Sequence, residues 1–386
     1  MTAIKTYNKI AKAGLDVFGA NYRISDNESE PVGALVRSAD LHNESFPESL
    51  IAIGRAGAGT NNIPIHELTE RAVAVFNTPS ANANAVKELT VLGLLLASRK
   101  VVLGIEWAKG LKGKGSEISA LVEKGKSAFS GPELSGKALG VIGLGAIGVL
   151  VANAAYHLGM RVYGYDPYLS VQNALNLSHH ITYVTDIKEI YASCDYITLH
   201  IPENPSTKNT INKETISAMR DGVRVINFAR GGLVCGEDMK AALECGKVAA
   251  YVVDFPSEEL LCVDGVVSIP HLGASTPESE ENCAVMAAHE LIDYIENGNI
   301  TNSVNLPSVS MLRSGEMRIC VVHRNIPNML SAITSAVAEG GVNIENLLNK
   351  SKGEYAYTML DVNNCEKNAV KNRIEAIDGI LRVRII

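Results

Sequence analysis

The order of apolar and polar positions along this chain of 386 residues predicts two layers in which strands and helices alternate. Such alternation is typical of parallel sheets covered by helices. The expected strands of the first layer are Ile4–Tyr7, Val32–Val36, Leu50–Ile53 and Ala72–Phe76. Those of the second layer are Leu139–Ile142, Arg161–Tyr165, Tyr196–His200, Val223–Asn227, Ala249–Asp254 and Val266–Ile269. The pattern therefore predicts an α/β protein with two Rossmann-like parallel-sheet domains.

The segments around the second layer predict how the domains are joined. Asn82–Arg99 is a long, mostly apolar stretch, which indicates a helix buried between domains or subunits. The Lys/Gly-rich stretch Lys109–Gly125 is expected to be an exposed connector. Glu278–Glu296 has a helical pattern and is expected to return to the first layer, and the Asn-, Ser- and Pro-containing stretch Gly298–Gly315 is expected to be a linker.

The last 70 residues have a different pattern, which predicts a third domain. The expected order is strand, helix, strand, strand, helix, strand, a βαββαβ arrangement of ferredoxin-like type. Gly340 and Gly341 stand where the first of these helices would end. We therefore expect a substrate-binding domain over 1–96 completed by 279–300, a Rossmann domain over 97–278, a linker over 301–315 and a C-terminal domain over 316–386.

The strand that ends at Ile142 leads into a glycine pattern typical of dinucleotide binding. Gly143 permits a tight turn, Gly145 lets the backbone approach a pyrophosphate, and Gly148 allows close packing of helix and strand. The N-terminus of the following helix favours an anion. Asp166 lies about 20 residues further on, where a carboxylate accepts from the ribose 2′-OH. Because that carboxylate would repel the 2′-phosphate of NADP, the predicted cofactor is NAD.

Composition excludes several classes of partner. With 35 basic and 42 acidic residues the formal charge is −7, so nucleic acid and anionic membranes are not expected partners. The seven cysteines form no CxxC pair, which argues against a metal site or a disulfide framework and for a reducing compartment. The first residues lack the apolar core of a signal peptide, so a cytoplasmic location is expected.

Three segments after the glycine motif end at the carboxyl side of expected strands, where open α/β sheets bind ligands. They are 227–232 (NFARGG), 254–259 (DFPSEE) and 270–276 (PHLGAST). A hydroxy-acid dehydrogenase needs a cation for the substrate carboxylate, a base for the hydroxyl proton and a partner for that base. Arginine, histidine and a carboxylate suit these tasks in turn.

In these motifs the chain resembles the D-2-hydroxyacid dehydrogenases, and most closely their 3-phosphoglycerate-oxidising branch. The resemblance covers nearly the whole length. The matching words are 35–39 (LVRSA), 54–59 (GRAGAG), 76–79 (FNTP), 133–137 (ELSGK), 143–148 (GLGAIG), 227–232 and 270–276. It implies NAD-dependent oxidation of 3-phosphoglycerate to 3-phosphohydroxypyruvate, the first step of the phosphorylated route to serine.

The resemblance also implies roles for individual residues. The catalytic residues would be Arg230, Glu259 and His271; Glu258 stays open as the histidine's partner, because the local sequence departs from the family's Asp-Val-Phe-x-x-Glu-Pro. The cofactor would contact Thr78, Gly143, Gly145, Ala146, Ile147, Gly148, Asp166, Phe228, Ala229, Asp254, Gly273 and Ala274. Relatives often carry Arg at the position of Ala146. The substrate's phosphate and backbone would contact Arg37, Ser38, Arg55, Gly57 and Asn82.

The C-terminal domain resembles an ACT domain, a small-molecule sensor. The positions matching the family's serine-binding residues are His323, Asn325 and Asn343, which implies a serine effector bound across a subunit interface. The usual Pro-Gly of the turn is Pro327-Asn328 here. A homodimer or homotetramer is expected.

Three alternatives remain open from the sequence. The chain could be another D-2-hydroxyacid dehydrogenase, such as a glyoxylate/hydroxypyruvate reductase. It could be a non-catalytic, NAD-sensing binding protein of the same fold. The C-terminal domain could serve only as an assembly platform.

Overall fold

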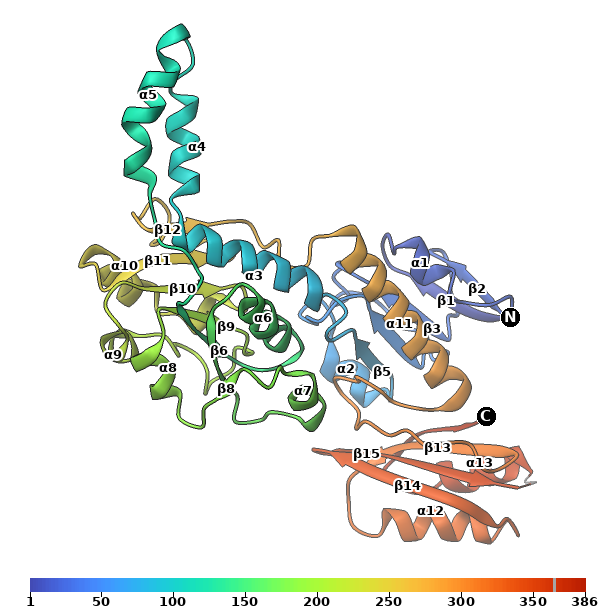
Figure 1. The fold of residues 1–386 in the computed structure, drawn as a ribbon. Coiled ribbons are helices and arrows are strands. Elements are labelled where there is room, and N and C mark those ends of the chain that lie inside the picture. The colour runs from blue at the N-terminus through green and yellow to red at the C-terminus, as the bar shows by residue number, and fades with distance from the viewer. Residues whose placement is uncertain (364–365) are drawn as a thin grey trace. The chain divides into compact units, whose positions relative to one another are not determined.

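The computed structural model describes residues 1–363 and 366–386 as two compact units. The first combines Met1–Asn82 with Pro277–Ile386, and the second is Ala83–Thr276 (Figure 1). The chain thus leaves the first unit once and returns to it. The architecture is α/β, with two parallel sheets and a smaller antiparallel sheet, as the sequence predicts.

The parallel sheet of the first unit has the order β2-β1-β3-β4-β5. Its strands are β1 (Thr2–Thr6), β2 (Tyr22–Ser25), β3 (Gly33–Val36), β4 (Ala52–Arg55) and β5 (Ala74–Asn77). The helices of this part are α1 (Lys12–Leu15), α2 (Ile65–Glu70) and the long α11 (Pro277–Asn297). α11 packs on β3, β4 and β5. A Cβ at Gly54 would lie 3.1 Å from Leu291 of α11, so glycine permits the close approach of strand and helix.

The second unit has a seven-stranded parallel sheet with the order β12-β11-β10-β9-β6-β7-β8. Its strands are β6 (Ala138–Ile142), β7 (Arg161–Tyr165), β8 (Thr182–Tyr183), β9 (Tyr196–Leu199), β10 (Val223–Asn227), β11 (Val248–Val253) and β12 (Val266–Ser268). Its helices include α3 (Ala83–Ser98), α6 (Ala146–His157), α7 (Val171–Asn176), α8 (Ile187–Ser193), α9 (Lys213–Ala218) and α10 (Gly236–Glu244). The order reverses between β6 and β9, which is the position where doubly wound sheets bind ligands.

The helix α3 belongs to the second unit, whereas the sequence prediction assigned residues 83–96 to the first domain. The reason is packing: α3 lies on α6, β10 and β11. A Cβ at Gly93 would meet the ring of Phe228 at 2.9 Å, so this helix sits directly on the sheet.

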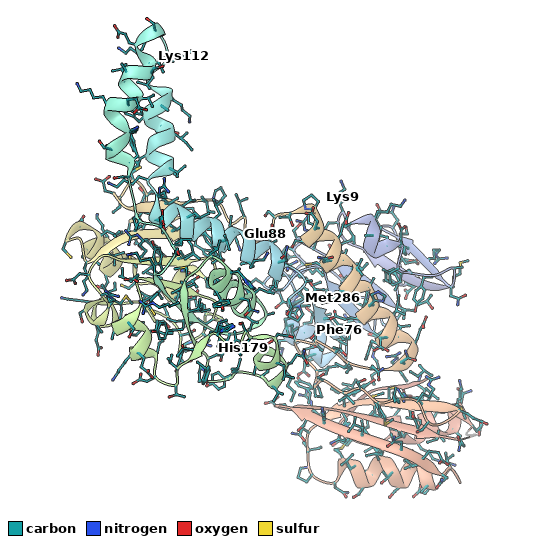
Figure 2. The ribbon with its side chains drawn as sticks, in the orientation of Figure 1. Lys9, Phe76, Glu88, Lys112, His179 and Met286 are labelled. Carbon is teal, nitrogen blue, oxygen red and sulfur yellow. The ribbon has the colours of Figure 1, made fainter. Side chains whose placement is uncertain are left out.

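The stretch expected to be an exposed connector is largely helical. α4 (Val101–Lys109) and α5 (Ile118–Gly125), with 3-10 turns over Gly115–Glu117 and Lys126–Phe129, form a hairpin that projects from the second unit (Figure 1). Lys112 lies at its tip (Figure 2). No residue of either helix is buried. The rings of Trp107 and Phe129 are 5.4 Å apart and join the two arms of this hairpin.

The C-terminal residues form an antiparallel sheet with the order β14-β15-β13-β16 and two helices. The elements are β13 (Met317–Arg324), α12 (Met329–Ala338), β14 (Ile344–Lys352), β15 (Tyr355–Val362), α13 (Lys367–Glu375) and β16 (Ile380–Ile385). This is the predicted βαββαβ order. One sheet face packs on both helices through Ile319, Val321 and Leu360.

The other face of that sheet shares a core with the rest of the first unit. Cys320, Val322, Tyr357 and Met359 belong to the same buried cluster as Phe76, Leu291 and Tyr294 (Figure 2 labels Phe76). The expected linker 301–315 contributes to this cluster, because Leu306 and Val309 are fully buried. Residues 301–315 therefore pack as part of the core, which explains why the C-terminal sheet falls in the first unit.

Among the residues that the structure describes, no helix combines the length and the apolar composition of a membrane span. Within the same residues, no group of three or more His, Cys, Asp or Glu side chains could hold a metal ion.

Candidate active site

The glycine motif forms the turn from β6 into α6. Gly143 has φ of 95°, a conformation that favours glycine. Gly145 is the N-cap of α6, and a Cβ there would have no atom within 4 Å, so the space above it is open. A Cβ at Gly148 would overlap the carbonyl oxygen of Gly143. The three glycines thus serve the turn, the open approach and the close packing that dinucleotide binding requires.

Asp166 stands at the end of β7 and is tied to the same turn. One of its carboxylate oxygens accepts from the backbone N–H of Leu144 at 2.9 Å, and the other accepts from Tyr168 N–H at 2.8 Å. The side chain is half-buried, so its remaining lone pairs face solvent. Ala146 and Ile147 form the first turn of α6. The residues present therefore fit the pyrophosphate and ribose of NAD.

Arg230 follows β10 and is held by a buried amide. Asn227, which is fully buried, donates to the carbonyl of Arg230 at 2.9 Å and accepts from Ala229 N–H at 3.2 Å. Arg230 itself is exposed, and its guanidinium donates to the Ala229 carbonyl at 2.6 Å. The sequence analysis did not assign a role to Asn227, although its place at the strand end is a signal for loop support.

His271 lies in the loop between β12 and α11 and is exposed. Its ring centroid is 4.7 Å from that of Phe255. Phe255 in turn lies beside Gly231, where a Cβ would be 3.3 Å from the Phe255 Cβ. Contacts through Phe255 therefore connect the loop of His271 with the loop of Arg230.

Asp254 directly follows β11 and lies near the loops of Arg230 and His271. It is fully buried, and neither carboxylate oxygen has a hydrogen bond of ordinary geometry. Burial raises its pKa, while the nearby charges of His271 and Arg230 and the N–H of Gly273 partly oppose this rise. A buried carboxylate without a partner is costly unless a ligand satisfies it. The structure thus brings Arg230, Asp254 and His271 together.

The structure does not bring Glu259 to His271. The Glu259 carboxylate accepts from the Ser257 hydroxyl at 3.4 Å and lies against Gly236, the first residue of α10. Glu258 and Glu259 line a depression of about 790 Å³ together with Lys240 and Glu244. Among the described residues neither glutamate is hydrogen-bonded to His271. The short loop after Pro256 directs both side chains toward α10.

The expected substrate residues meet at the carboxyl ends of β3, β4 and β5. In the strand register, Arg55 pairs with Val36 on one side and with Asn77 on the other. Arg37 and Ser38 directly follow Val36 and therefore lie beside Arg55. Asn8 fixes this edge: its side chain accepts from Arg37 N–H at 2.9 Å and donates to Ser38 Oγ at 3.1 Å.

Arg55 is half-buried and curls over Gly57, where a Cβ would overlap the guanidinium and where φ of 145° favours glycine. Its Nε is buried without a hydrogen-bond partner. Burial lowers the pKa of Arg55, and the like charge of Arg37 acts in the same direction. Thr78 directly follows β5 and is buried, and its hydroxyl has no hydrogen-bond partner. Asn82 is half-buried and directly precedes α3. These free polar atoms make the edge a candidate anion site.

The remaining predicted cofactor residues are distributed over the strand ends of the second unit. Phe228 is buried, Gly273 is buried against Val86, and Ala229 and Ala274 are half-buried. Phe228 and Ala229 end β10, and Gly273 and Ala274 follow His271. They share this edge of the sheet with Asp254.

The predicted effector residues lie on the C-terminal sheet and its turns. His323 is buried, and its ring nitrogens are 2.8 Å from the Arg324 carbonyl and from Thr358 Oγ1. Asn325 donates to the Gly353 carbonyl at 3.0 Å, and Asn343 donates to Glu345 at 3.0 Å; both are exposed. Asn328 precedes α12 with φ of 69°, so it adopts the left-handed conformation that Asn tolerates better than most residues.

Comparison with known proteins places these features in a family. Residues 94–275 match the model "D-isomer specific 2-hydroxyacid dehydrogenase, NAD binding domain". The D-3-phosphoglycerate dehydrogenase of Haemophilus influenzae is 33% identical over 358 residues, which are 89% of this chain and 82% of that protein. The enzyme of the same name from Escherichia coli K12 is 35% identical over 355 residues, 88% of this chain and 82% of that protein.

A solved structure agrees with this assignment. The glyoxylate reductase from Paecilomyes thermophila superposes with a TM-score of 0.64 at 25% identity, covering 78% of this chain and 98% of that one. The glycine turn, Asp166 and the strand-end loops of the second unit lie within the residues that match the NAD-binding model. The chain belongs to the D-isomer specific 2-hydroxyacid dehydrogenases and is an NAD-dependent oxidoreductase.

Proposed function

We propose that this oxidoreductase converts 3-phosphoglycerate to 3-phosphohydroxypyruvate, the first step of the phosphorylated route to serine. The observation that carries the proposal is the pair Arg37 and Arg55 at adjacent strand ends, with a buried Arg55 Nε that has no partner. Two guanidinium groups suit a phosphate, because each can donate two parallel hydrogen bonds. The names of the bacterial relatives at 33–35% identity support this substrate.

The chemical steps follow from the strand-end residues of the second unit. Arg230 would bind the substrate carboxylate. His271 would accept the hydroxyl proton from the oxygen on C2, which leaves that oxygen as the carbonyl of the product. The glycine turn and Asp166 would hold NAD, which would supply the acceptor for the hydride from C2. His271 and Arg230 thus hold and deprotonate the substrate, while the glycine turn and Asp166 would hold the cofactor.

The identity of the carboxylate that supports His271 is a separate proposal. Family resemblance assigns it to Glu259, which would need the loop 256–265 to turn toward His271. Asp254 is the alternative, supported by its burial near the loops of His271 and Arg230 and by the charges of both residues, which oppose the rise of its pKa. Asp254 would also accept from the carboxamide of the nicotinamide, which would satisfy its free oxygens.

We further propose serine as an effector of the C-terminal domain. Asn325 and Asn343 are exposed amides that can bind the polar groups of an amino acid. Both ring nitrogens of His323 already have partners, so His323 would position the turn rather than contact the effector.

The expected homo-oligomer has a candidate surface on the α4–α5 hairpin. Val101, Val102, Leu103 and Ile105 are 40–57% exposed on α4. Such an apolar helix face is typical of a surface that another chain covers. We propose that a second copy of this chain covers it. Leu103→Asp with Ile105→Asp would then give monomers in light scattering, whereas an unchanged mass would contradict this assignment.

Formation of NADH from 3-phosphoglycerate, with and without serine, tests the main proposal. We expect turnover that D-lactate and D-glycerate do not match, and a lower rate with serine. Arg37→Ala should raise KM for 3-phosphoglycerate far more than for D-glycerate. Equal rises for the two substrates would refute phosphate recognition at Arg37, and preference for glyoxylate or hydroxypyruvate would assign the chain to a reductase.

A further inference from the structure

Glu280 lies at the proposed phosphate site but takes no part in the proposed transfer of proton and hydride. It lies in the first turn of α11, and its carboxylate is 2.5 Å from the Arg37 guanidinium. The two residues are 243 positions apart in the chain. Both side chains are about 40% exposed, so the pair can be reached from solvent.

The charge balance of this edge differs between its two arginines. Glu280 neutralises Arg37, whereas no acidic side chain of the described residues pairs with Arg55. The edge therefore carries one uncompensated positive charge while Glu280 is in place. Two such charges hold a phosphate dianion more tightly than one, and Glu280 offsets the second while it remains paired with Arg37.

The geometry of α11 permits this exchange. The helix lies on β3 and β4, and the ion pair itself places its first turn beside Arg37, which follows β3. A half-exposed ion pair contributes little free energy, since water screens it. A phosphate oxygen offers Arg37 a charge-assisted hydrogen bond in return. Replacing the carboxylate by a phosphate therefore costs little.

Resting on the proposed function, we propose that Glu280 is a counter-ion that competes with the substrate's phosphate for Arg37 and so sets the specificity of the site. An end group with a double negative charge displaces Glu280. A neutral hydroxyl does not, and such a substrate gains nothing from Arg37. The substrate class that the site selects is a hydroxy acid with a phosphate at its far end.

Glu280→Gln tests the proposal, because glutamine keeps the shape and can still accept from Arg37 but carries no charge. We expect KM for 3-phosphoglycerate to fall about two- to fivefold, which corresponds to about 0.4–1 kcal/mol at 1.4 kcal/mol per factor of ten. KM for D-glycerate and both kcat values should stay unchanged. Glu281→Gln is the matched control, since Glu281 is exposed on the same turn and the change removes the same charge.

Inorganic phosphate gives a second measurement that does not depend on turnover. It should raise the melting temperature of Glu280→Gln at a lower concentration than that of the parent protein or of Glu281→Gln. An unchanged or higher KM for 3-phosphoglycerate in Glu280→Gln would overturn the proposal and would make Glu280 a residue that only holds Arg37 in place. If Arg37→Ala raises KM equally for 3-phosphoglycerate and D-glycerate, the proposed phosphate site itself is wrong. Failure of the Glu280 proposal can therefore be distinguished from failure of the proposed function.

Discussion

Asp361 in the C-terminal sheet and Asp254 in the seven-stranded sheet are both fully buried aspartates, yet their surroundings are opposite. Asp361 accepts two hydrogen bonds from Arg318, at 2.6 and 2.8 Å, and one from Ser314 N–H at 2.7 Å. Asp254 has no hydrogen bond of ordinary geometry. Each is near a positive charge, but only Asp361 touches it.

The pKa values of these two groups move in opposite directions. Burial alone would raise the pKa of Asp361, but the hydrogen bonds from Arg318 and Ser314 outweigh burial, and the pKa is lowered. For Asp254, burial dominates and the pKa is raised. The contrast indicates that Asp361 serves the fold, whereas Asp254 is left for a ligand to satisfy.

The largest expected effect concerns His271, the histidine near Asp254. His271→Ala should lower kcat by a factor of about 10²–10⁴, because general acid–base catalysis by a positioned side chain accelerates a reaction by about that factor. Binding of NAD, followed by fluorescence titration, should be kept. Turnover near that of the parent protein would remove His271 from the proposed role and leave Asp254 without a catalytic neighbour.

Asp361→Asn should break the buried ion pair with Arg318. Loss of the charge leaves Arg318 buried without its counter-ion, and the free energy of unfolding in urea should fall by about 3–5 kcal/mol. Asp378→Asn, an exposed change in the same domain, should have almost no effect. Since the folded-state pKa of Asp361 is lowered, its contribution is present above the unfolded pKa and is lost as the pH falls through the folded value.

Asp254→Asn should leave stability unchanged or raise it, because the carboxylate has no hydrogen bond of ordinary geometry to lose and the cost of a buried charge is removed. Affinity for NAD should fall about 10- to 100-fold if Asp254 accepts from the cofactor. If Glu259→Gln lowers kcat and Asp254→Asn does not, Glu259 is the histidine's partner.

Glu290 on α11 is intermediate between Asp361 and Asp254, because only one of its carboxylate oxygens has a hydrogen bond. Its substitution should have the smallest of these effects. One of its oxygens accepts from Asn302 at 2.7 Å, the other is buried without a partner, and burial raises its pKa to about 7. The stability due to the neutral form is present below the unfolded pKa of about 4.5 and is lost as the pH rises to about 7. Glu290→Gln should therefore stabilise the protein by about 1 kcal/mol at pH 8 and hardly at pH 4.5. Equal changes in melting temperature at pH 4.5 and pH 8 would contradict this prediction.

Local sequence patterns predicted the elements well where backbone constraints are strong. The turn at Gly143, the alternating strands of both parallel sheets and the βαββαβ order are all observed. The patterns failed where burial depends on distant residues. Residues 109–125 contain Gly and Lys and resembled a connector, yet Trp107 and Phe129 join them into a helical hairpin. Residues 301–315 resembled a linker, yet Leu306 and Val309 fill the core.

The amino-acid sequence by itself determined the glycine turn, the cofactor class and the positions of Arg37, Arg55, Arg230 and His271 at strand ends, because these depend on backbone geometry and residue type within short segments. Only the tertiary structure decided which charges meet. It paired Glu280 with Arg37, buried Asp254 near the loops of Arg230 and His271, and turned Glu259 toward α10. Contacts of that kind join segments far apart in the chain, and packing selects them through burial and charge rather than through any local pattern.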